Sequence, residues 1–125
     1  MANFGLSQVY DVYQDIEAIH SNLLYMAPET MIQNKFNEKS DMWSLGCTMF
    51  EACNLEPVFD EPGATEYRKA VIKNIRSKKP DGIDTSKYSI ELEKLLRNMC
   101  DKDAIFRPTA RHVLKMPFIR IYRSQ

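Results

Sequence analysis

The feature that most constrains the fold is NEKSDMWSLGCTMFEAC, at residues 37–53. A helix is predicted to open at Ser40, with Asp41 where a carboxylate suits the positive end of the helix dipole. The residues that follow leave hardly any face polar, and a helix that is apolar all round is normally buried all round. Other segments are therefore expected to cover it. Its apolar residues are Met42, Trp43, Leu45, Gly46, Cys47, Met49, Phe50, Ala52 and Cys53.

Shorter helices are predicted on both sides of this segment, and residues 1–24 are predicted to be a loop because they show no sustained period. Pro28 suits a first helical turn, which predicts a short helix over residues 29–33. Thr65 and Ser89 can each cap a helix, and Pro108 with Thr109 can open a last one. The residues expected to face inward are Tyr67, Ala70, Val71, Ile75, Leu92, Leu95, Leu96, Met99, Cys100, Val113 and Leu114.

Composition is that of one globular domain, with 44% hydrophobic and 27% charged residues in a chain of 125. The charges of seventeen basic and seventeen acidic residues cancel. The chain therefore has no net positive charge that would attract nucleic acid or an anionic membrane. One basic stretch is predicted to be the solvated face of a helix rather than a phosphate site, because no aromatic residues are interleaved with its charges. It comprises Arg68, Lys69, Lys73, Arg76, Lys78 and Lys79.

The cysteines and the chain start favour a reducing compartment, cytoplasmic or nuclear. Cys47, Cys53 and Cys100 have neither C-x-x-C spacing nor an even count, so they are expected to be small core residues. The start lacks the basic flank and apolar run of a targeting segment. Glu51 interrupts the long apolar helix well short of a bilayer span.

Motifs that would identify a catalytic or metal site are absent from these 125 residues. The four glycines lie too far apart for any glycine-rich phosphate loop. His20 and His112 stand alone in the sequence and are interpreted as surface or capping residues rather than metal ligands. No G-x-S-x-G elbow supports a serine nucleophile.

Four segments in order resemble a eukaryotic serine/threonine protein kinase, most closely the NIMA-related kinases. They are NFGLS at residues 3–7, YMAPE at 25–29, KSDMWSLGC at 39–47 and DKDAIFRPTARHVL at 101–114. The resemblance implies a mainly α, partial kinase-like fold that runs from the D-F-G-like segment through the C-terminal lobe, without the N-terminal lobe. Residues 1–125 would form one partial kinase domain, with an activation-segment-like region at 1–29 and a helical subdomain at 30–125.

Two positions depart from the kinase pattern. Asn3 stands before Phe4 and Gly5, where the family has a magnesium-binding aspartate, and it offers a neutral carbonyl oxygen instead. Asn22 stands shortly before Tyr25, where the family places a threonine that meets the catalytic aspartate. Asn3 implies weak metal binding, and both changes point away from normal catalysis. The alternative is that Asn3 still binds magnesium poorly, which would give a slow kinase rather than an inactive one.

Other residues take structural roles by resemblance. Glu29 and Arg107 resemble the A-P-E glutamate and its arginine partner, a buried ion pair. Trp43 belongs to the central apolar helix of the kinase fold. Asp41 resembles the aspartate that accepts hydrogen bonds from the catalytic loop, and without donors its carboxylate must reach water or shift its pKa upward.

The expected function is that of a fragment or degenerate kinase that is non-catalytic by itself and at most a binding module. No cofactor is expected for this chain, although the family uses ATP and magnesium. A protein partner on the exposed C-lobe surface is the expected interaction, with no nucleic acid and no membrane. The alternative is the truncated sequence of an active NIMA-related-like kinase, in which case an in-frame catalytic-loop-like segment is expected upstream of Met1.

Overall fold

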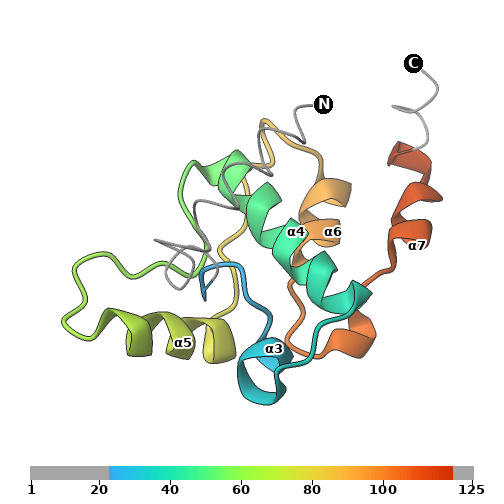
Figure 1. Ribbon diagram of the computed structural model, residues 1–125. Helices are drawn as coiled ribbons and strands as arrows, with labels where there is room; N and C mark the ends of the chain where they lie inside the picture. Colours follow the sequence, from blue (N-terminus) through green and yellow to red (C-terminus); the bar gives the residue numbers. More distant parts are fainter. Residues whose placement is uncertain (1–22, 120–125) are drawn as a thin grey trace, which may run out of the picture.

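The computed structural model describes residues 23–119, and within them the chain is helical with no strand (Figure 1). The mainly α prediction is therefore confirmed for this part of the chain. The predictions at Asn3, Phe4, Gly5, Asn22 and His20 lie outside the described residues. The elements are α3 (Pro28–Gln33), α4 (Glu38–Asn54), α5 (Tyr67–Ser77), α6 (Ile90–Met99), the 3-10 helix η1 (Ala104–Phe106) and α7 (Ala110–Leu114).

Helix α4 begins earlier than predicted, because Asn37 rather than Ser40 is its N-cap. The Asn37 side-chain oxygen accepts hydrogen bonds from the backbone N–H groups of Lys39 at 2.9 Å and Ser40 at 3.1 Å. These amides would otherwise lack a partner in the first turn. Asp41 remains in that turn, as expected for a carboxylate near the helix N-terminus.

Within the described residues α4 is not covered on every side, which corrects the expectation of complete burial. Trp43 and Phe50 are fully buried, whereas Leu45 is 47% exposed. Exposed residues recur at steps of four and three and so lie on one side of the helix. Apart from the terminal residues Glu38 and Asn54, which are also exposed, they are Asp41, Leu45, Thr48 and Ala52.

The core lies between α4 and α6, which run side by side in Figure 1. Gly46 permits their close approach, since a Cβ at this position would stand 2.9 Å from both the Sγ of Cys100 and the Cβ of Met99. Cys47 and Cys100 are buried in the same region, and their sulfur atoms are 4.0 Å apart. The prediction that these two cysteines are core residues is confirmed, and Cys53 is partly buried.

The predicted caps are right at two helices and wrong at one. Ser89 and Thr109 accept hydrogen bonds from backbone N–H groups at the starts of α6 and α7. Helix α5 instead begins after Glu66, without a side-chain cap, so Thr65 does not have the predicted role. Leu114 is 46% exposed rather than turned inward, because α7 ends at this residue and packs mainly through Val113.

Candidate functional site

The most strongly connected polar group in the described residues is the guanidinium of Arg107. Arg107 follows η1 in extended backbone, directly before Pro108. Its side chain is 0% exposed. A buried charge is costly unless it is paired and hydrogen-bonded, so the surroundings of this group decide whether the fold tolerates it.

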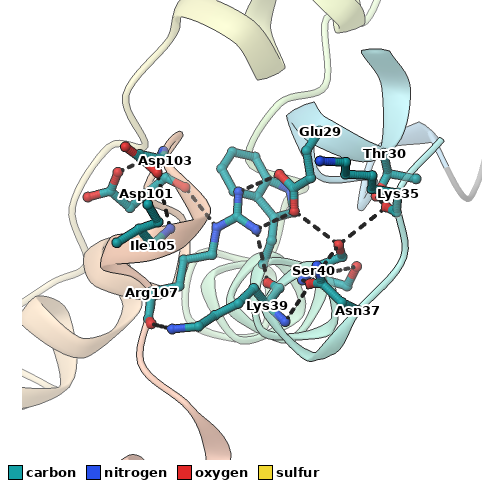
Figure 2. A network of polar contacts seen from close by, with 12 residues as sticks. Glu29, Thr30, Lys35, Asn37, Lys39, Ser40, Asp101, Asp103, Ile105 and Arg107 are labelled. Carbon is teal, nitrogen blue, oxygen red and sulfur yellow. Dashed lines mark hydrogen bonds and ion pairs between the residues drawn. The ribbon is translucent and has the colours of Figure 1, made fainter. Parts of the chain in front are cut away.

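The structure brings Glu29 and Arg107 together, although they are far apart in the sequence (Figure 2). The Arg107 Nη1 donates to Glu29 Oε2 at 2.7 Å, and Nη2 donates to Oε1 at 2.8 Å. This is the bidentate (two-pronged) geometry that a planar guanidinium makes with a carboxylate. The pair joins the first turn of α3 to the segment between η1 and α7.

Backbone carbonyls take further hydrogen bonds from Arg107. Its Nε donates to the carbonyl of Asp101 at 2.8 Å, and Nη1 donates to the carbonyl of Lys39 at 2.9 Å. In return the Lys39 ammonium donates to the backbone carbonyl of Arg107. The network therefore links α3, the first turn of α4 and the loop before η1.

Glu29 stays ionised in this setting. The Ser40 hydroxyl donates to its Oε2 at 2.9 Å, in addition to the bonds from Arg107. Burial by itself would raise the pKa of the Glu29 carboxyl, but the hydrogen bonds from Arg107 and Ser40 outweigh it and lower the pKa below its ordinary value. The charged form is thus the one that the fold stabilises.

Trp43 supplies an aromatic surface for two cations. Its ring stacks on Phe59 with centroids 5.3 Å apart, and the Arg107 guanidinium carbon lies 5.1 Å from the Trp43 ring centroid. The Lys102 ammonium lies 5.0 Å from the same centroid. Such contacts are favourable because the ring face is electron-rich. Within residues 23–119 the buried indole N–H of Trp43 has no hydrogen-bond acceptor.

Lys102 is a site residue that the sequence reasoning missed. Its ammonium donates to the carbonyl of Lys78 at 2.6 Å and lies 4.6 Å from the centroid of the Phe59 ring. Burial lowers its pKa to about 8. No sequence motif identifies Lys102 as a site residue. A lysine that directly follows an amphipathic helix is ordinarily expected to be solvent-exposed.

Asp41 and Tyr25, singled out by resemblance, lie apart from the Arg107 network. Asp41 is exposed, so its carboxylate reaches water, which is one of the two outcomes anticipated for it. The Tyr25 hydroxyl donates to Glu51, and its carbonyl accepts a hydrogen bond from Ser44 at 2.7 Å. Tyr25 thus fastens the segment before α3 to the middle of α4.

The chemistry available in the described part of the chain is that of a structural ion pair. In residues 23–119 no three histidine, cysteine, aspartate or glutamate side chains come together as a metal site would require. No helix within the same range combines the length and apolar character needed to cross a bilayer. The Arg107 donors are engaged with Glu29 and with backbone carbonyls, so they are not directed at an open cavity.

Comparison with known protein families matches residues 1–119 to the protein kinase domain. Together with the Glu29–Arg107 pair and the helical architecture, this establishes that the chain belongs to the protein kinase family. Its relatives narrow the class to serine/threonine kinases of the NIMA-related group.

Several NIMA-related kinases align with most or all of the chain. Serine/threonine-protein kinase Nek9 of Mus musculus is 31% identical over 126 residues, which covers 100% of this chain. Serine/threonine-protein kinase Nek4 of Mus musculus is 30% identical over 99% of the chain, and G2-specific protein kinase nim-1 of Neurospora crassa is 30% identical over 100%. The chain spans 12%, 15% and 14% of the lengths of these relatives, respectively.

Proposed function

We propose that this polypeptide is a C-lobe portion of a serine/threonine kinase domain that transfers no phosphate by itself and acts as a binding module. The observation that carries the proposal is Asn3, a neutral amide at the position where the family has its magnesium-binding aspartate. The 125 residues also contain no H-R-D-type catalytic loop and no glycine-rich loop.

ATP and magnesium, the family's cofactors, do not find a matching set of groups in this chain. At Asn3 a neutral amide oxygen replaces a carboxylate, and a single neutral ligand is a poor substitute for the hard anionic oxygens that magnesium prefers. Residues 23–119 add no cluster of ligands that could compensate. Binding of Mg-ATP by this chain is therefore expected to be undetectable.

A phosphotransfer assay tests the proposal. The purified chain is incubated with labelled ATP, magnesium and a mixture of generic protein substrates, and the expected incorporation equals that of the blank without enzyme. Calorimetric titration with Mg-ATP is expected to show no binding. The matched control is Asn3→Asp, which restores the carboxylate and is expected to stay inactive because the catalytic loop is still missing. Turnover that persists after removal of contaminating kinases would overturn the proposal.

A second candidate is that these residues belong to an active NIMA-related-like kinase. The intact two-pronged ion pair favours it, because this contact would then tie an activation segment to the helices that follow. Mapping the transcript and identifying tryptic peptides of the expressed protein separates the candidates. An in-frame catalytic-loop segment in the expressed protein, together with kinase activity, selects the second.

The proposed location is the cytoplasm or the nucleus. Three free cysteines within the described residues support a reducing compartment, since two of them lie buried as thiols. Imaging of a fluorescent fusion at native expression level provides the test, and accumulation in the secretory pathway would contradict it.

A further inference from the structure

Helix α5 has basic residues at its N-terminus, where carboxylates would be more favourable. Arg68 and Lys69 occupy its first turn, which contains no acidic residue. Positive charge at this end opposes the helix dipole, and the N-cap Glu66, whose carboxylate favours the dipole, makes no capping hydrogen bond that would add to its effect. The first turn of α5 therefore departs from the usual preference for acidic residues at a helix N-terminus. Such departures are common where a surface serves a function.

The basic residues of α5 form one stripe that we name the α5 basic face. Lys69, Lys73 and Arg76 follow steps of four and three, which places them on the same side of the helix. Val71 and Ile75 point the other way and are fully buried, so core packing holds α5 in place despite the repulsion between neighbouring cations.

These charges are poorly compensated. Among the described residues the single ion pair on this face joins Lys69 to Glu66 at 3.5 Å, with both side chains more than two-thirds exposed at 80% and 69%. Exposed pairs of this kind contribute little. Lys73 and Arg76 have no carboxylate partner within residues 23–119. The face is therefore an excess of positive charge on a chain whose net charge is zero.

The α5 basic face also has a shallow depression. This open groove of about 580 Å³ is lined, within residues 23–119, by Lys69, Ile72, Lys73, Arg76 and Ser77. Ile72 is partly buried and contributes an apolar patch between cations, and the Ser77 hydroxyl donates to the carbonyl of Lys73 at 2.7 Å. The groove thus combines positive charge with one apolar contact point.

We propose that the α5 basic face docks an acidic peptide segment of a partner protein, with an apolar side chain of that segment seated on Ile72. The inference rests on the binding role proposed above and supplies its surface and the chemistry of its partner. Carboxylates of the segment pair with Lys69, Lys73 and Arg76, which relieves the repulsion within α5.

A membrane or a nucleic acid fits this face less well. A helix that lies on a bilayer needs a broad apolar face beside its cations, but Val71 and Ile75 of α5 are turned into the core. Single-stranded nucleic acid is bound by aromatic stacking between cations, and none of the described residues that line the groove is aromatic. An acidic peptide needs neither feature.

Fluorescence anisotropy with a labelled peptide of alternating glutamate and leucine tests the proposal on the complete chain. The expected result is saturable binding that weakens as salt rises. Combined Lys69→Glu, Lys73→Glu and Arg76→Glu substitutions are expected to weaken it about tenfold or more. The matched control carries Lys87→Glu, Lys94→Glu and Arg111→Glu, which make the same change in net charge at exposed positions elsewhere. It is expected to weaken binding less than about threefold.

Other outcomes are equally decisive. No binding of the peptide, or equal weakening by the two triple variants, would overturn the docking face. Binding to phosphatidylserine vesicles or to polyuridylate in place of the peptide would also overturn it. If circular dichroism shows that the first triple variant is unfolded, Lys73→Gln and Arg76→Gln are each measured, and unchanged affinity in both would refute the proposal. The phosphotransfer assay on the unmodified chain is independent of these results.

Discussion

Replacing Arg107 by alanine is the sharpest test of how this chain is held together. The substitution removes both hydrogen bonds to Glu29 and the hydrogen bonds that Arg107 donates to the carbonyls of Asp101 and Lys39. It also removes a cation from the face of Trp43. The Glu29 carboxylate keeps the Ser40 hydroxyl as a partner but loses its counter-charge.

The expected loss of stability follows from the burial of the pair. Removing one member of a buried ion pair typically costs about 3 to 5 kcal/mol, because the other charge is left uncompensated. Glu29 is 16% exposed and so reaches some water, which places the expected loss near the lower end, at about 3 kcal/mol. For a domain of this size, such a loss lowers the melting temperature by about 10 °C or more.

Thermal melts followed by circular dichroism at neutral pH measure the effect. The matched control is Arg111→Ala, an exposed arginine on α7, which is expected to cost well under about 1 kcal/mol. A second control, Arg107→Lys, keeps the charge but loses the two-pronged geometry and is expected to fall between the two. Equal melting temperatures for Arg107→Ala and Arg111→Ala would refute the reasoning.

The pH dependence provides an independent check. Because the folded-state pKa of Glu29 lies below its ordinary value of 4.5, the ion pair contributes stability above pH 4.5 that is lost as pH falls through the folded pKa. Arg107→Ala removes the main group that lowers this pKa. The variant is therefore expected to lose less stability on acidification than the unmodified chain, and an identical loss would contradict the assignment.

Three further predictions concern packing, titration and capping. Gly46→Ala is expected to destabilise by about 1 to 3 kcal/mol in a chemical denaturation experiment, because its Cβ would stand 2.9 Å from Met99 Cβ. The pKa of Lys102, lowered to about 8 from 10.5, means that the unfolded chain binds more protons between these values. The Lys102 contribution to stability should therefore rise with pH across that window, so the stability of the unmodified chain relative to Lys102→Met should increase with pH there. Ser89→Ala should cost about 1 kcal/mol, whereas Thr65→Ala, which removes no cap, should change melting little.

The sequence by itself determined the helices whose signals are local. Ser89 and Thr109 mark the starts of α6 and α7 because a short polar side chain can accept from amides in the next turn, whatever the rest of the fold does. Pro28 likewise indicates α3 by its fixed backbone angle. The choice of Ser40 over Asn37 at α4 failed because several capping residues stand close together, and local propensity does not decide among them.

The approach of Glu29 to Arg107 was anticipated only through resemblance to a family, since residues so distant in sequence carry no local signal of contact. Tertiary structure alone decided the place of Lys102. Its burial depends on Trp43 and Phe59 stacking beside it, an arrangement set by how α4 packs against the loop that follows it. Burial and the pKa shift it causes arise from groups that come together only when the chain folds, and for this reason composition and periodicity could not predict them.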